Sequence, residues 1–105
     1  MTEPMPRRFK ALLYAASSEE GGRKTPFGLG YRPLFRLTDV GPYTSSIIDK
    51  IGVAQEAMRP GEVSDVEMLL ISPDELPGGV KVGTRFELCE GLNVVGWGIV
   101  RARAD

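Results

Sequence analysis

Histidine is absent from the 105 residues of the chain, and cysteine occurs only once. The missing imidazole excludes Ser/His and Cys/His nucleophile pairs, histidine metal ligands and the commonest general base near neutral pH. Acidic pairs at residues 19–20 and 74–75 stand in turn-rich stretches, without the partners that a metal site or an acid–base pair requires. We therefore predict a protein that is not an enzyme and that holds no metal and no cofactor.

The chain also lacks a long apolar run, because none of its stretches approaches the ~20 residues of a membrane span. Its first residues carry charges without the apolar segment of a secretory signal. The single cysteine, Cys89, cannot form an internal disulfide and is typical of a reducing compartment. We expect a cytoplasmic protein with no membrane partner.

Neither sign of charge is in large excess, since 13 Lys and Arg oppose 14 Asp and Glu for a net charge of -1. No global field therefore attracts nucleic acid. The distribution is uneven, however: residues 1–36 carry seven basic and three acidic side chains, and residues 37–105 carry six and eleven. A locally basic face is one interpretation, and interleaving of the two halves on folding is the other.

Short strands joined by turns account for most of the sequence. Its 13 glycines and 8 prolines are spread out rather than clustered. Period-two alternation, with Phe9, Ala11 and Leu13 on one face of the first strand, predicts the following strands: residues 9–16, 31–37, 63–71, 84–89 and 94–103. Five or six such strands indicate a closed barrel or a sandwich. We expect one domain over residues 9–105, preceded by a flexible arm at residues 1–8.

Residues 44–58 are ambiguous. Ile47, Ile51, Ala54 and Met58 recur at helical spacing. Gly52 and the β-rich neighbourhood on both sides favour an irregular loop or short strands instead, and this is our prediction.

The stretch at residues 19–35, EEGGRKTPFGLGYRPLF, combines a turn, a rigid corner and the start of a strand. Gly21-Gly22 predicts a tight reversal, because glycine accepts positive φ at little steric cost. Pro26 fixes its own φ and favours extended geometry in the residue before it. In the following strand, Tyr31, Pro33, Phe35 and Leu37 alternate with Arg32, Leu34 and Arg36, which predicts that the second set points outward.

Two glycines near the C-terminus flank the only tryptophan, Trp97. Gly96 and Gly98 predict a close backbone approach or a bulge. We interpret Trp97 as a packed anchor on the last strand, with base stacking as the alternative. We predict that the side chain of Cys89 serves to pack its strand.

The motifs GGRKTPF and GYRPLF resemble the C-terminal (third) domain of elongation factor Tu, which carries GGR-x-TPF followed by GYRP-x-F. The match continues in the family's order through MRPGE, LLISP, Glu90-Gly91 and VVGWGIV. The resemblance implies a small closed antiparallel β-barrel of the Greek-key type, with about six strands. It does not extend to a GTPase domain, and the chain has no G-x-x-x-x-G-K-[ST] loop, so we expect no GTP binding.

The resemblance also implies two surfaces. In the full factor one edge of the barrel contacts the T-stem of aminoacyl-tRNA, and another packs against the GTPase domain. On the tRNA side, the family arginine matches Arg23 and the family Glu-Gly turn matches Glu90-Gly91. A family lysine is replaced by Ser72 and a family glutamine by Leu34, which removes a phosphate-seeking charge and adds an apolar side chain.

Two binding hypotheses follow. The first is docking of a protein partner, or of a second copy of the chain, through the corner at residues 19–36, with these contact residues: Phe27, Arg32, Leu34 and Arg36. The second is binding of RNA, such as the tRNA T-stem, through another set: Arg23, Lys24, Glu90 and Gly91. The basic side chains of this stretch also fit a solvated face in which Arg23 braces the turn at residues 19–20.

Overall fold

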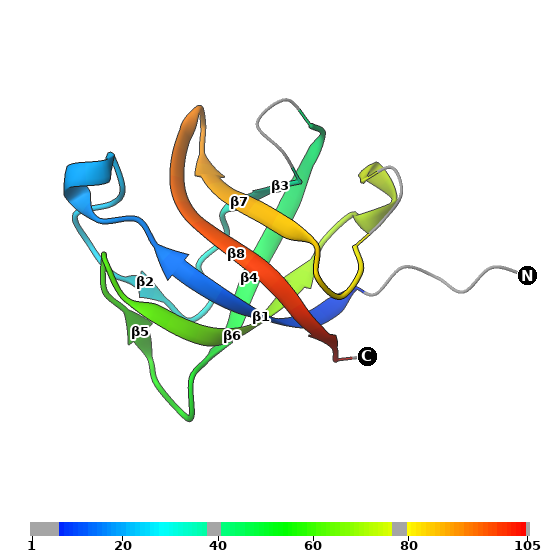
Figure 1. Cartoon of the computed structure of the whole chain (residues 1–105), viewed down its shortest axis with the longest axis horizontal. Coiled ribbons are helices and arrows are strands. Elements are labelled where there is room, and N and C mark those ends of the chain that lie inside the picture. Colours follow the sequence, from blue (N-terminus) through cyan, green and yellow to red (C-terminus); the bar gives the residue numbers. More distant parts are fainter. Residues whose placement is uncertain (1–6, 38–40, 77–79, 105) are drawn as a thin grey trace, which may run out of the picture.

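Six antiparallel strands form a closed barrel in the computed structural model, which describes residues 7–37, 41–76 and 80–104 (Figure 1). Around the barrel the strand order is β1-β6-β4-β3-β7-β8. The strands are β1 (Arg8–Ala15), β3 (Leu34–Arg36), β4 (Tyr43–Ile51), β6 (Val63–Leu70), β7 (Arg85–Glu90) and β8 (Asn93–Arg103). The predicted antiparallel barrel of about six strands is confirmed, and the sandwich alternative is wrong.

Three short elements complete the fold. A two-stranded sheet pairs β2 (Phe27–Gly28) with β5 (Ala57–Met58) beside the barrel. Single 3-10 turns, η1 (Ser18–Glu20) and η2 (Pro73–Glu75), follow β1 and β6. No helix in the described part of the chain is both long and apolar enough to cross a membrane.

Aromatic rings fill the centre of the barrel. The alternation predicted for β1 is confirmed, since Phe9, Ala11 and Leu13 are all buried. Phe9 meets Phe35 edge-on at 5.6 Å between ring centroids, and Phe35 stacks on Phe86 at 4.7 Å. Each such pair contributes about 0.5–1.5 kcal/mol beyond the area that it buries. These three rings join β1, β3 and β7, which are not all neighbours in the sheet.

The arm predicted at residues 1–8 lies mostly outside the described residues. Arg8 already belongs to β1, and the carbonyl of Arg7 accepts a hydrogen bond from the amide of Leu70. The barrel therefore begins slightly earlier than the alternation alone suggested.

Residues 44–58 form strands and no helix, so the prediction is confirmed in part: β5 is short, but β4 is a continuous strand of nine residues. Its inward positions include Thr44 and Ser46, two polar residues that hide the alternation of the strand. An irregularity between Ile48 and Lys50 then places Ile51 in the core.

Hydrogen bonds compensate the two buried hydroxyls. Ser46 Oγ donates to the carbonyl of Pro33 at 2.9 Å. Thr44 Oγ1 accepts from the amide of Ser72 at 3.2 Å. A buried hydroxyl with such a partner escapes most of the desolvation penalty. Polar residues can therefore occupy core positions of this strand.

The strand predicted at residues 31–37 is reduced to the three residues of β3. Phe35 is fully buried as predicted, whereas Tyr31 and Leu37 pack against the core only in part. Pro33 has no amide hydrogen to donate to a strand ladder. The end predicted at Thr38-Asp39 lies outside the described residues.

The glycines of β8 permit close packing, as predicted. A Cβ on Gly98 would lie closer than 3.0 Å to the ring of Phe86, and one on Gly96 would meet the carbonyl of Tyr14. Both glycines face inward, so Trp97 between them faces outward. The packed anchor predicted for Trp97 is wrong: its side chain is 37% exposed and stacks on Tyr14 on the outer surface.

Candidate functional site

The turn predicted at Gly21-Gly22 is confirmed and is tied to the β7–β8 turn. Gly21 has φ +91°, which favours glycine, and its carbonyl accepts a hydrogen bond from Asn93 Nδ2 at 2.7 Å. Before this turn, Ser17 and Glu20 form a capping box around η1. Segments about seventy residues apart in the sequence are thereby held together at one end of the barrel.

Arg23 lies at the centre of this junction. Its guanidinium donates to Glu90 at 2.7 Å and to Thr25 Oγ1 at 2.8 Å. It also lies 4.6 Å from the centroid of the Tyr31 ring, a cation–π distance. Arg23 therefore braces the β7–β8 turn, not the turn at residues 19–20.

Two of the four residues predicted to bind RNA are thus brought together, but as an ion pair. Arg23 and Glu90 compensate each other's charge. Gly91 follows in the β7–β8 turn with φ +58°, and Lys24 is exposed beside Arg23. Because Arg23 and Glu90 cancel each other's charge, Lys24 supplies the net positive charge of these four residues.

Tyr31 is the most perturbed tyrosine of the junction. Burial raises the pKa of its phenol to about 12. Its hydroxyl has no hydrogen-bond partner within the described residues, while its ring stacks on Phe27 at 4.8 Å. The side chain therefore acts as packing beneath Arg23.

The structure separates the four residues predicted to bind a protein partner. Phe27 is only 2% exposed and belongs to the core, because its strand turns that side chain inward against Met58. It is therefore removed from the candidate surface. Arg32 is exposed in the loop before β3.

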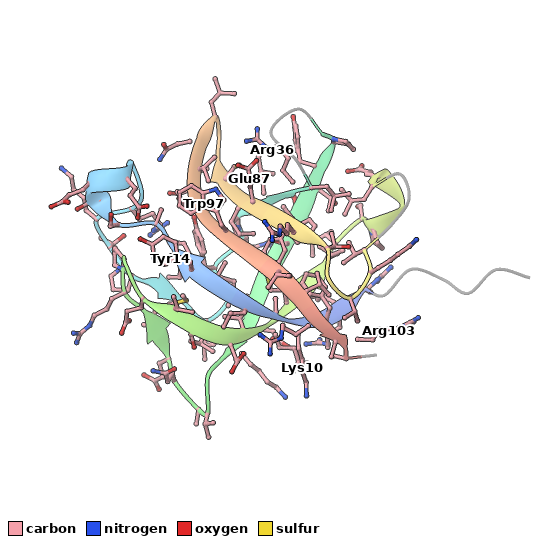
Figure 2. All side chains as sticks on the ribbon, viewed as in Figure 1. Lys10, Tyr14, Arg36, Glu87, Trp97 and Arg103 are labelled. Carbon is pink, nitrogen blue, oxygen red and sulfur yellow. The ribbon has the colours of Figure 1, made fainter. Side chains whose placement is uncertain are left out.

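Leu34 and Arg36 remain together on the outer face of β3. Arg36 binds Glu87 of the neighbouring strand through Nε at 3.1 Å and Nη2 at 2.9 Å. Figure 2 shows this pair at the end of the barrel where β3 and β7 lie side by side. Both side chains are about one-fifth exposed, so solvent screens this pair less than a fully exposed one.

Leu34 lines a hollow of about 200 Å³, which we call the Leu34 hollow. Its lining residues are Leu34, Arg36, Tyr43, Cys89, Gly91 and Leu92. Tyr43 is 58% exposed and Leu92 is 99% exposed, so apolar side chains surround its opening. The hollow brings together outward positions of β3 and β4 with the β7–β8 turn.

Cys89 lies at the base of this hollow and is nearly inaccessible, which confirms its predicted packing role. Burial raises the pKa of its thiol, which lowers the thiolate fraction near neutral pH. The structure thus gives no support to a reactive cysteine. Among the described residues, no group of three or more potential ligands is arranged to hold a metal ion.

Sequence reasoning missed Tyr43 and Leu92. Tyr43 starts β4, whose length was not predicted, and Leu92 directly follows the Glu90-Gly91 turn. For Leu92, the available signal is an apolar residue at the tip of a hairpin, because solvent normally surrounds such tips.

Family comparison agrees with the motifs and with the barrel. Residues 4–102 match the model of the family described as Elongation factor Tu C-terminal domain. That domain is a non-catalytic β-barrel and serves as a binding module in translation factors. The match extends over nearly the whole chain, and the closed six-stranded barrel is consistent with it. This chain therefore belongs to the elongation factor Tu C-terminal domain family.

Proposed function

We propose that this domain is a non-catalytic binding module that docks a protein partner, or a second copy of itself, through the Leu34 hollow. The observation that carries the proposal is the group of apolar side chains at its opening: Leu34, Tyr43 and Leu92. Exposed apolar side chains gathered around a concavity are typical of protein interaction sites. We place this function in the cytoplasm, in keeping with the single reduced cysteine.

The polar edge of the hollow suits the same function. Arg36 is held by Glu87 in a fixed position, so little side-chain freedom is lost when a partner binds. Because the pair is electrically compensated, the hollow favours an apolar side chain over a phosphate group. Arg32 is two residues before Leu34, and Glu90 lies between the lining residues Cys89 and Gly91. Both charged side chains suit the polar rim of an interface.

RNA binding at Arg23, Lys24, Glu90 and Gly91 is the alternative. The ion pair between Arg23 and Glu90 weighs against it, because a phosphate would have to displace the carboxylate. Lys24 alone supplies a weak phosphate contact. We therefore favour protein docking.

Two measurements test the proposal. Size-exclusion chromatography with light scattering gives the oligomeric state, and affinity capture from a lysate of the source cells identifies a partner. We expect the wild-type domain to form a dimer or to retain a specific partner, and Leu34→Arg to abolish either complex. Leu29→Arg is the matched control, since Leu29 is 49% exposed and does not line the hollow. A monomer that captures only background proteins would refute the proposal.

A further inference from the structure

A second hollow, of about 330 Å³, lies on the outer face of the barrel over β1 and β8, and we call it the Trp97 hollow. Its lining residues are Leu12, Tyr14, Val63, Arg85, Trp97, Gly98 and Ile99. It shares no lining residue with the Leu34 hollow. Apart from Arg85 and the Tyr14 hydroxyl, its side chains are predominantly apolar.

Two aromatic rings form one wall of the Trp97 hollow. Tyr14 and Trp97 face each other across β1 and β8, with ring centroids 5.9 Å apart and an angle of 18° between their planes. Figure 2 shows both side chains at the same end of these strands. The Tyr14 hydroxyl donates to Glu20 of the capping box, which fixes the orientation of its ring.

The base of this hollow is aliphatic. Leu12 and Ile99 are opposite each other in the β1–β8 register and are both half-buried. Such a base, next to a rigid aromatic wall, fits one bulky apolar side chain of a ligand. The shape is therefore that of an anchor pocket.

Positive charge continues from the hollow along the same two strands. Lys10 precedes Leu12 on the outer face of β1, and Arg101 follows Ile99 on β8. Figure 2 shows Lys10 toward the other end of β1 from Tyr14. Lys10, Arg85 and Arg101 form no ion pair within the part of the chain that the structure describes, and all three are exposed.

Nearby acidic groups only partly offset these charges. Lys10 and Arg101 line an adjoining groove of about 460 Å³ together with Lys50, Asp65 and Glu67. Glu67 is already engaged by Arg8 at 3.5 Å and by Lys50 at 3.8 Å. The groove and the hollow together retain more cations than anions.

From this arrangement we infer that the outer β1–β8 face binds an acidic peptide segment of a partner protein. A bulky apolar side chain of the peptide enters the Trp97 hollow, and flanking carboxylates pair with Arg85, Lys10 and Arg101. This adds a second binding surface to the function proposed above and does not depend on the Leu34 hollow.

Two features favour a peptide over single-stranded nucleic acid. Nucleic-acid sites stack bases on open aromatic faces, whereas Tyr14 and Trp97 each present one face to the other. The base of the hollow is aliphatic, which suits a leucine or phenylalanine side chain.

Fluorescence of Trp97, the only tryptophan of the chain, reports directly on this site. The probe is the tryptophan-free peptide DEDEFDEDE, titrated to about 1 mM in low salt, where charge attraction is strongest. We expect a saturable change in Trp97 emission. Lys10→Glu combined with Arg101→Glu should weaken binding about tenfold or more.

Matched controls separate the site from general charge effects. Lys24→Glu combined with Arg32→Glu changes the net charge equally at exposed positions outside this face, and it should alter affinity less than about threefold. Leu34→Arg should have no effect, so failure of this inference is distinguishable from failure of the proposed function. The peptide DEDEGDEDE, without the anchor, should bind about tenfold more weakly.

Three outcomes would overturn the inference. One is the absence of a saturable change with wild-type protein. Another is equal binding of the anchorless peptide. The third is equal or tighter binding of an oligouridylate of the same net charge, which would assign the face to nucleic acid. All three are measured on the unmodified domain, so they remain decisive if a variant fails to fold.

Discussion

The corner at residues 19–36 and the outer β1–β8 face use their side chains in opposite ways. In the corner, Arg23 is engaged by Glu90 and Phe27 is buried. On the β1–β8 face, Lys10 and Arg101 have no ion-pair partner among the described residues and Trp97 is exposed. Arg23 and Phe27 thus hold the barrel together, whereas Lys10, Arg101 and Trp97 remain available for binding.

Replacing Phe27 by alanine should give the largest effect. The buried ring packs on Tyr31, so its loss leaves a cavity and should cost about 3–5 kcal/mol of unfolding free energy. Urea denaturation followed by circular dichroism measures this loss. Leu29→Ala, at an exposed site of the same segment, should cost less than about 0.5 kcal/mol. Similar costs for both variants would contradict the core assignment of Phe27.

Gly22→Ala should destabilise the domain by about 2–3 kcal/mol. A Cβ at this position would lie closer than 3.0 Å to the backbone carbonyl of Ala16, which cannot move without disturbing the end of β1. Gly28→Ala is the matched control, because a Cβ there meets no atom within 4 Å. Thermal denaturation should separate the two variants clearly. A tolerated Gly22→Ala would show that the corner is less constrained than we infer.

Arg23→Ala should have a smaller effect, of about 1 kcal/mol. The change removes a partly exposed ion pair with Glu90 and the contact with the Tyr31 ring, each worth roughly 0.5–1 kcal/mol. Lys24→Ala should fall within about 0.5 kcal/mol of wild type. A double-mutant cycle with Glu90→Ala measures the coupling energy between Arg23 and Glu90. A coupling energy near zero would show that Arg23 does not brace the β7–β8 turn.

Tyr31→Phe should leave the unfolding free energy near neutral pH nearly unchanged, because the hydroxyl it removes has no partner among the described residues. An effect should appear only at high pH. The folded domain keeps the phenol protonated to about pH 12, above its ordinary pKa of 10.0. The wild type should therefore lose stability progressively between these two values, and the variant should lack this loss.

Ultraviolet titration of tyrosinate provides the measurement for this prediction. One tyrosine should ionise near pH 12 in the folded wild type and be missing in Tyr31→Phe. The absence of any tyrosine that ionises near pH 12 would place Tyr31 in solvent instead.

Much of the fold could be predicted because most strands alternate clearly, as Phe9, Ala11 and Leu13 do. The length of β4 was not predicted because Thr44 and Ser46 occupy core positions, and only their hydrogen bonds with Pro33 and Ser72, in the loops before β3 and η2, make this possible. Trp97 was misplaced because Gly96 and Gly98 supply the close packing that was assigned to the ring between them.

The candidate site was less predictable than the fold. Alternation placed Leu34 and Arg36 on the outer face, but it does not say which neighbours they meet. The ion pairs of Arg23 with Glu90 and of Arg36 with Glu87 each join residues more than fifty positions apart. Such pairs depend on the order of strands around the barrel, which local sequence does not encode.

Site-specific photo-crosslinking in the native cell tests the docking function most directly. A photoreactive amino acid replaces Leu92 at the opening of the Leu34 hollow, or Val53 as a control that is 96% exposed and outside it. We predict a discrete adduct, with a partner protein or a second copy of the chain, from position 92 and none from position 53. No adduct from position 92, or the same adducts from both positions, would contradict the account.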